Sequence, residues 1–450
     1  MLLQFSVSNY GCFRTRQTLN FAASAQDKSL PDNVIQQKLP GLPGSQWVKG
    51  VAVYGANASG KSTVLGALEA LANMVTESAK MTDPKEPIPQ IVPFALCPGQ
   101  PTVPTAFSVV FVTDGVRYEY RVAATRERIV HESLRAFPKA KEQLWFSRDF
   151  DAQTQRYTFT PERPTGFTRD PQLEGYTLSN MLFLSKAIAS NRSDLEPVYR
   201  WFTERLAFLD LSQASSLDHR FTLAQAVKKT GLQDGILKLL RHADLGVAGV
   251  RAVDTFPGGE VPDGFFEGLS QEIQERLRKR NWTQPELTHR SQAGTEVALP
   301  WQRESTGTHR FFALVGPWLD ILHKGYTVCI DELETSLHPL LVRELLRLLF
   351  SSQENASGAQ LLFTTHNPLL LDGSLLRRDQ VWFTDKDDHG EGHLYPLTDY
   401  QPRKEESLVR GYLSGRYGAV PFLPDGLLVA PEASPAPPKP ARKGRGKAHE

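Results

Sequence analysis

The chain has 450 residues, of which 40% are hydrophobic and 22% charged, as expected for a globular protein with two or three folding units. Its 51 basic residues balance its 50 acidic residues, so the overall charge indicates neither a nucleic-acid nor a membrane partner. The absence of a long apolar run excludes a predicted transmembrane helix, and the three scattered cysteines exclude a disulfide scaffold or a recognisable metal motif.

The N-terminal residues 1–7 alternate in polarity like a strand and lack the basic region and apolar core of a signal peptide. Together with Cys12, Cys97 and Cys329, which indicate reduced thiols, this predicts a cytoplasmic protein.

The first motif is the sequence Gly-Ala-Asn-Ala-Ser-Gly-Lys-Ser at residues 55–62, which matches G-x-x-x-x-G-K-[ST]. An apolar run at 51–54 precedes it, and a helical pattern follows and is expected to end near Lys80, before three prolines. Backbone N–H groups of such a loop and the helix N-terminus bind phosphates. The motif therefore predicts a site for ATP and Mg²⁺, with Lys61 on the β- and γ-phosphates and Ser62 on the metal. The predicted binding residues are Gly55, Asn57, Gly60, Lys61, Ser62 and Thr63.

Residues 106–122 alternate with period two around Asp114-Gly115, which predicts a β-hairpin. Further strand-like pieces follow near residues 129–132, 144–146 and 157–159, so we expect an antiparallel lobe. From residue 178 the period becomes helical, in short segments broken by Gly231, Gly246 and a Pro-Gly-Gly turn. This favours a compact helical insert, because no heptad pattern is long enough for a coiled-coil arm.

A buried-looking strand at residues 326–330 ends in Asp331-Glu332. The first acid is expected to bind Mg²⁺ together with Ser62, and Glu332 to orient or deprotonate the attacking water. A second strand at residues 361–365 ends in His366, which could donate to the γ-phosphate. Since sites of α/β proteins gather at the carboxyl ends of strands, we interpret Glu332 and His366 as catalytic rather than as core residues. The acids at 385–390 are interpreted as a hairpin turn rather than a second metal site.

These segments resemble the ATPase heads of the SMC/RecF/OLD branch of ABC-type ATPases. The resemblance is carried by the strand at residues 3–10, the P-loop, the run Asp-Glu-Leu-Glu-Thr-Ser-Leu-His-Pro at 331–339 and Thr-Thr-His at 364–366. Within this branch the chain is most similar to stand-alone AAA-type ATPases associated with abortive infection and often encoded beside RloB-like or other TOPRIM-type partners. The resemblance implies an α/β fold, in which a mixed sheet is flanked by helices and carries the antiparallel β lobe and the helical insert.

The resemblance also implies a role for residues 304–310, which occupy the place of the ABC signature. Ser305 and Gly307 match the signature, while its Leu and final Gln are absent. In the family these residues bind the γ-phosphate held by a second subunit, which implies a homodimer or higher oligomer through the heads. Without the other motifs, the same residues would be read as an ordinary helix N-cap with a polar first turn.

The domains expected from the sequence are the N-terminal half of the head at 1–100, the β lobe at 101–175, the insert at 176–295, the C-terminal half of the head at 296–425 and a basic, proline-rich tail at 426–450.

The leading functional hypothesis is an ATPase that switches a separate effector, a nuclease or toxin, in phage defence. The alternative is a DNA-repair or recombination ATPase that grips duplex DNA through Arg276, Arg278, Lys279 and Arg280. That run is also typical of a solvated helix face.

Overall fold

The computed structural model describes residues 1–36, 42, 45–99, 102–211, 219–228, 231–243, 246–254, 283–403 and 406–421. The basic run from Arg276 to Arg280 and the tail at 426–450 lie outside the described residues, so the predictions made on them stay predictions.

The sheet that carries the P-loop has six strands in the order β11-β15-β16-β5-β17-β18. The first five are mutually parallel, and β18 pairs antiparallel with β17 as the hairpin expected around residues 385–390. The strands are β11 (Leu206–Asp210), β15 (Thr327–Asp331), β16 (Gln360–Thr364), β5 (Gly50–Gly55), β17 (Val381–Lys386) and β18 (Gly392–Pro396). Parallel pairing brings the ends of β5, β15 and β16 to one edge of the sheet.

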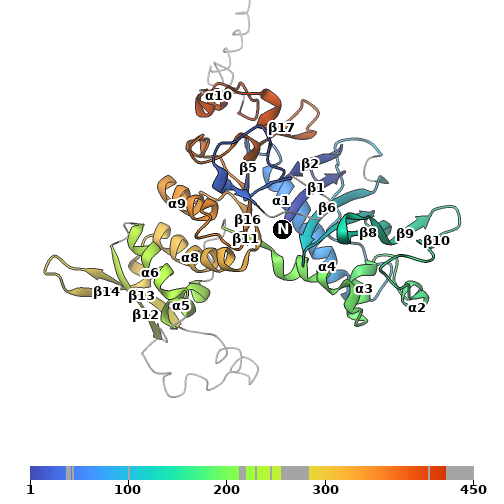
Figure 1. Ribbon diagram of the computed structural model, residues 1–450, viewed down its shortest axis with the longest axis horizontal. Helices are drawn as coiled ribbons and strands as arrows, with labels where there is room; N and C mark the ends of the chain where they lie inside the picture. The colour runs from blue at the N-terminus through green and yellow to red at the C-terminus, as the bar shows by residue number, and fades with distance from the viewer. Residues whose placement is uncertain are drawn as a thin grey trace, which may run out of the picture. The chain divides into compact units, whose positions relative to one another are not determined.

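Helices cover both faces of this sheet because its central strands are apolar on both sides. On β5, Val51 and Val53 belong to the core shared with α1 (Lys61–Glu77), while Ala52 and Tyr54 belong to the core shared with α8 (Thr306–Lys324) and α9 (Pro339–Phe350). Figure 1 shows α8 and α9 near one side of the strands and α1 near β1 and β6. The predicted end of α1 near Lys80 is confirmed, since a 3₁₀ turn at Ser78–Lys80 follows the helix.

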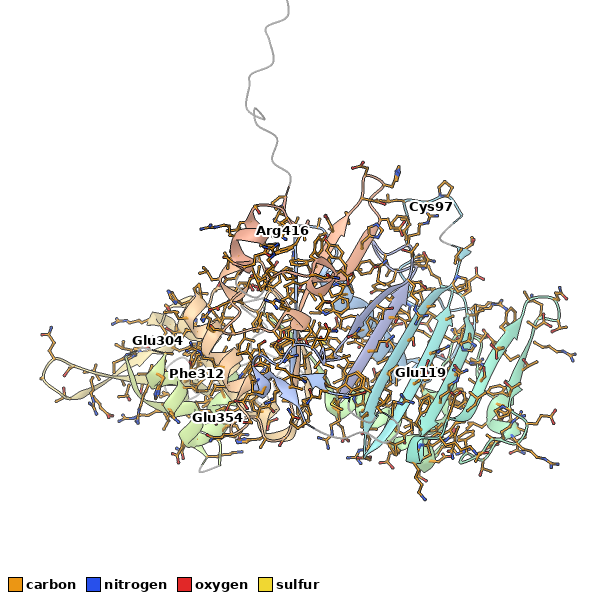
Figure 2. All side chains as sticks on the ribbon, turned by 45° about the horizontal axis from the view of Figure 1, so that its top comes forward. Cys97, Glu119, Glu304, Phe312, Glu354 and Arg416 are labelled. Atoms are coloured by element: carbon orange, nitrogen blue, oxygen red, sulfur yellow. The ribbon has the colours of Figure 1, made fainter. Side chains whose placement is uncertain are left out.

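The second sheet is antiparallel, with the strand order β10-β9-β8-β7-β6-β1-β2. Its strands are β1 (Leu2–Ser8), β2 (Gln17–Asn20), β6 (Thr105–Thr113), β7 (Val116–Ala124), β8 (Ile129–Phe137), β9 (Gln143–Asp151) and β10 (Arg156–Thr160). The predicted hairpin is confirmed: Asp114 and Gly115 adopt φ values of 49° and 75°, which a two-residue turn of this type requires. Figure 2 shows Glu119 on this sheet. Helix α1 contacts both sheets, so the N-terminal strand and the P-loop share one core.

The segment at 176–295 contains the expected short helices and, in addition, strands. Its helices are α3 (Phe183–Ala189), α4 (Glu196–Arg200), α5 (His219–Val227) and α6 (Gln233–His242), with α2 (Pro171–Gly175) just before it. Strand β11 joins the central sheet, and β12 (Val247–Asp254), β13 (Thr283–Arg290) and β14 (Glu296–Pro300) form a small antiparallel sheet. These strands were missed because β12 and β11 find their partners far along the chain, where local periodicity gives no signal.

Apart from short 3₁₀ and π-helical turns, the other described elements are the two-stranded sheet of β3 (Val34–Ile35) and β4 (Trp47–Val48), and the helix α10 (Leu408–Leu413). Cys12, Cys97 and Cys329 are free thiols. Within the described ranges, no helix has the length and apolar character needed to cross a membrane.

Candidate functional site

The P-loop connects the end of β5 to the start of α1, as the motif predicted. Gly60 precedes the helix with φ 114°, a conformation that side chains other than glycine rarely adopt. A Cβ on Gly55 would lie 2.6 Å from the carbonyl oxygen of Thr384 on the neighbouring strand β17. Both positions therefore need glycine, and the loop is packed closely between its strand and its helix.

The Lys61 ammonium lies inside the loop, where its Nζ donates hydrogen bonds to the carbonyl oxygens of Gly55 (3.1 Å) and Ala56 (3.0 Å). Burial lowers the pKa of Lys61, while the carboxylates of Glu332, Asp331 and Glu334 act in the opposite direction. These carboxylates thus belong to the electrostatic surroundings of the P-loop lysine. Of the other predicted binding residues, Asn57 and Ser62 are exposed and Thr63 is half-buried.

The two acids predicted on β15 are held by the neighbouring strand β16. Thr364, the last residue of β16, donates its hydroxyl hydrogen to Oδ1 of Asp331 at 2.5 Å and accepts the backbone N–H of Glu332 at 2.8 Å. Leu333 also donates its N–H to the carbonyl of Thr364 at 3.2 Å. A single threonine therefore fixes both acidic residues. Thr364 lies in the Thr-Thr-His run at 364–366, and its role becomes visible only once β15 and β16 are paired.

Glu332 and His366 approach one another across the strand ends. Oε1 of Glu332 lies 3.6 Å from Nε2 of His366, which is beyond hydrogen-bond distance, and both side chains are about half-exposed. Glu332 has φ 49°, a left-handed conformation that is uncommon outside glycine and is found at functional sites. Both predicted catalytic groups are thus accessible and mutually close.

Glu334 is a fourth group at this edge that sequence reasoning left without a role. Its Oε1 accepts the backbone N–H of His366 at 2.5 Å. Its Oε2 is buried and has no hydrogen-bond partner among the described residues. The only signal in the sequence was its presence within the motif at 331–339.

Ser305 and Gly307 are not brought to this cluster. Ser305 is the N-cap of α8, where its hydroxyl accepts the N–H of Thr308 at 3.0 Å, so the plain capping interpretation is satisfied. Gly307 lies against Ser336, whose carbonyl oxygen would be 3.3 Å from a Cβ at that position. Arg310 of the same helix donates to the carbonyl of Thr335 at 3.0 Å. The signature segment therefore packs on the loop after β15, and no hydrogen bond within the described residues joins it to the P-loop.

The start of α8 contacts the small sheet of β12, β13 and β14 and the short turn that precedes α8. Glu304 pairs with His289 of β13 at 2.8 Å, and His309 stacks on Trp301 with ring centroids 4.1 Å apart. Phe312 of α8 also lies against Trp301, with ring centroids 5.3 Å apart; Glu304 and Phe312 are labelled in Figure 2.

The residues present fit a nucleoside triphosphate with Mg²⁺. The loop has the close-packed glycines and buried lysine that a phosphate group requires, and the oxygens of Ser62 and Asp331 are the donor type that Mg²⁺ prefers. The described residues include no group of three or more His, Cys, Asp or Glu side chains that could hold a metal ion by themselves. This donor set is suited to Mg²⁺, which takes few protein ligands and completes its shell with water and phosphate oxygens.

Two basic residues that follow the first strand are engaged within the chain. Arg14 lies 3.8 Å from Glu391, and Arg16 donates to the hydroxyl of Ser6 at 3.3 Å.

Comparison with known proteins gives three findings. Among curated proteins none matches the chain. A solved structure, the SMC head domain from Thermotoga maritima, is similar over 88% of this chain and 98% of its own, with 12% sequence identity and a TM-score of 0.38; at these values the likeness supports no statement about function. Residues 51–372, which span the P-loop, both acids and His366, match the model of a family described as "AAA domain, putative AbiEii toxin, Type IV TA system". The chain belongs to this family of AAA domains.

Proposed function

We propose that the chain binds ATP with Mg²⁺ and hydrolyses it to ADP and phosphate. The observation that carries the proposal is the meeting of the P-loop, Asp331, Glu332 and His366 at the carboxyl ends of three adjacent parallel strands. Membership of the AAA family supports the same conclusion.

In this proposal the P-loop binds the triphosphate through its backbone N–H groups and Lys61. The phosphate-contacting residues are Gly55, Asn57, Gly60, Lys61, Ser62 and Thr63. Lys61 exchanges the carbonyl oxygens of Gly55 and Ala56 for the more strongly attracting phosphate oxygens. Ser62 and Asp331 would hold Mg²⁺, and the bound ion would supply positive charge beside the phosphates.

Hydrolysis is assigned to the half-exposed pair at the strand ends. Glu332 accepts a proton from the attacking water, and His366 donates a hydrogen bond to the γ-phosphate. The 3.6 Å between their side chains leaves both groups free of each other and available to a substrate.

We further propose that two copies close face to face, with Ser305 and Gly307 of each contacting the nucleotide of the other. What supports this is that the signature segment packs on the loop at 332–336 and makes no hydrogen bond with the P-loop of its own chain within the described part. The start of α8 is an N-terminus of a 19-residue helix, which favours an anionic ligand.

The test is to mix two inactive variants. Ser305→Arg alone and Lys61→Ala alone should each lose hydrolysis. Their mixture should recover up to about a quarter of the wild-type rate per pair, because a mixed pair contains one intact composite site. A separate measurement, light scattering of Glu332→Gln with ATP, should detect a stable dimer. A monomer that hydrolyses ATP independently of dilution, or a mixture that recovers nothing, would overturn the shared-site arrangement.

The biological role we propose is control of a separate nuclease or toxin, of the TOPRIM or RloB-like kind, in phage defence. The support is the family description, which names a toxin and a toxin–antitoxin system. Cultures that express the wild-type chain with its neighbouring genes should retain more viable cells after phage challenge than cultures that express the Lys61→Ala variant. Equal survival would contradict the defence role and leave the ATPase intact. Salt-sensitive, ATP-dependent binding of duplex DNA by the purified protein would instead favour the repair class.

A further inference from the structure

The loop between β15 and α9 reaches across to the segment after β16 through one carboxylate. Oε1 of Glu334 accepts the backbone N–H of His366 at 2.5 Å, although the two residues are 32 positions apart. The bond is charge-assisted, and such bonds are about twice as strong as those between neutral groups. It fixes the main chain of His366 rather than its imidazole ring.

The second carboxylate oxygen of Glu334 has no hydrogen-bond donor among the described residues. This oxygen, Oε2, is buried, and a buried acceptor without a donor destabilises a fold. The hydroxyl of Tyr54, at the end of β5, is also buried without a partner in the described part of the chain. Unsatisfied groups of this kind are expected where a site is built for a reaction rather than for stability.

His366 and Glu332 are held by contacts between the same two segments. Thr364, at the end of β16, accepts the N–H of Glu332, and Glu334, in the loop after β15, accepts the N–H of His366. Each segment therefore holds a residue of the other. These two crossed contacts fix the main chain of both residues, whose side chains approach to 3.6 Å between Oε1 of Glu332 and Nε2 of His366.

We propose that Glu334 is a positioning residue that holds His366 in register with Glu332 through the main-chain N–H of His366. Glu334 itself does not contact the reacting atoms. The inference rests on the proposed function, because the pair that it positions is the pair to which we assign hydrolysis.

The kinetic test compares Glu334→Ala, Glu334→Gln, His366→Ala and the double variant Glu334→Ala/His366→Ala. Misplacement of a reacting group by about 1 Å can cost about 100-fold, so Glu334→Ala should lower kcat by about 10- to 100-fold with KM changed by less than about threefold. Glu334→Gln keeps an acceptor for the N–H and should retain kcat within about fivefold. The double variant should be no slower than His366→Ala, since residues that act as a unit are not additive.

A second measurement does not depend on hydrolysis. Hydrogen exchange at the amide of His366 in the nucleotide-free protein should be at least about 10-fold faster in Glu334→Ala and nearly unchanged in Glu334→Gln. Glu354→Ala, a variant of an exposed glutamate labelled in Figure 2, is the matched control and should behave like the wild type.

The two failures can be told apart. A wild-type protein that binds no ATP or never hydrolyses it sinks the proposed function, whatever the exchange result. If the wild type is active, then unchanged exchange at His366 in Glu334→Ala, or a double variant that is slower by the product of both single effects, overturns the positioning role.

Discussion

Two glutamates of this chain illustrate opposite ways of burying a carboxylate. Glu132, in the antiparallel sheet, is fully saturated: its Oε1 accepts from the Tyr120 hydroxyl at 2.8 Å and the Leu184 N–H at 2.9 Å, and its Oε2 from the Phe183 N–H at 2.6 Å. Two of these donors belong to the first turn of α3, where a negative charge is stabilised. Glu334, in the loop between β15 and α9, has one oxygen that accepts a hydrogen bond and one without a partner in the described part.

The cations of the two regions differ in the same way. Arg148 donates to the carbonyls of Met181 at 2.7 Å and Leu178 at 2.9 Å and lies 4.0 Å over the ring of Tyr157. Lys61 has two backbone carbonyls of its own loop, which a phosphate can replace. The chain itself holds the Arg148 guanidinium through both terminal nitrogens, although its Nε is buried without a partner in the described part. Lys61, by contrast, keeps capacity for a ligand at the strand ends.

The largest effect that would test this contrast is on stability. Glu132→Ala should lower the free energy of unfolding by about 3–5 kcal/mol, because it strands three donors and leaves the buried guanidinium of Arg148 without a counter-charge. Urea unfolding measures this. Glu127→Ala, at an exposed turn near the same sheet, should change stability by less than about 0.5 kcal/mol. A loss below about 1 kcal/mol in Glu132→Ala would break the comparison.

The next effect is on binding. Lys61→Ala should weaken ATP binding by about 10- to 100-fold, the value of one charge-assisted hydrogen bond of about 1.5–3 kcal/mol. Its unfolding free energy should change by less than about 1 kcal/mol, since within the described residues the ammonium donates to two carbonyl oxygens of its own loop. Titration with a fluorescent nucleotide measures the affinity, with the exposed Lys85→Ala as control. Equal affinity in both variants would show that the P-loop is not the nucleotide site.

A smaller effect concerns the seam between the P-loop and β17. The buried hydroxyls of Ser59 and Thr384 are hydrogen-bonded at 2.7 Å, and the Thr384 hydroxyl also donates to the carbonyl of Tyr54 at 3.3 Å. Ser59→Ala should therefore cost only about 1 kcal/mol of stability. Thr384→Val should cost more, because it leaves the Ser59 hydroxyl buried without this partner. Thermal unfolding of both variants gives the order, and the reverse order would contradict this account.

The smallest effect is a pH dependence. Burial raises the pKa of Glu132, while Arg148 and the backbone N–H groups of Leu184 and Phe183 oppose the rise. Since the folded state holds this proton more tightly, the stability linked to it is present below the unfolded pKa, near 4.5, and is lost as the pH rises through the folded pKa. Glu132→Gln removes that loss. The destabilisation of Glu132→Gln relative to the wild type should thus shrink as the pH rises from about 4 to about 8. Growth of the difference with pH would contradict the sign.

The sequence predicted the candidate binding and catalytic residues, but not the residues that hold them in place. The P-loop, Asp331, Glu332 and His366 each follow an apolar strand, a local pattern that a single sequence displays. Thr364 and Glu334 act on residues 32 or 33 positions away, so their contacts exist only once β15 and β16 pair. The strands of the insert were missed for the same reason.

By itself, the sequence determined that this chain has a strand–loop–helix phosphate site and two further strands ending in polar residues, because glycine conformation and side-chain period are local properties. Only the tertiary structure decided that β16 lies between β15 and β5, and that Ser305 caps α8 with no hydrogen bond to the P-loop within the described residues. Strand order is fixed by burial on both faces of the sheet, a sum over contacts that no short segment contains.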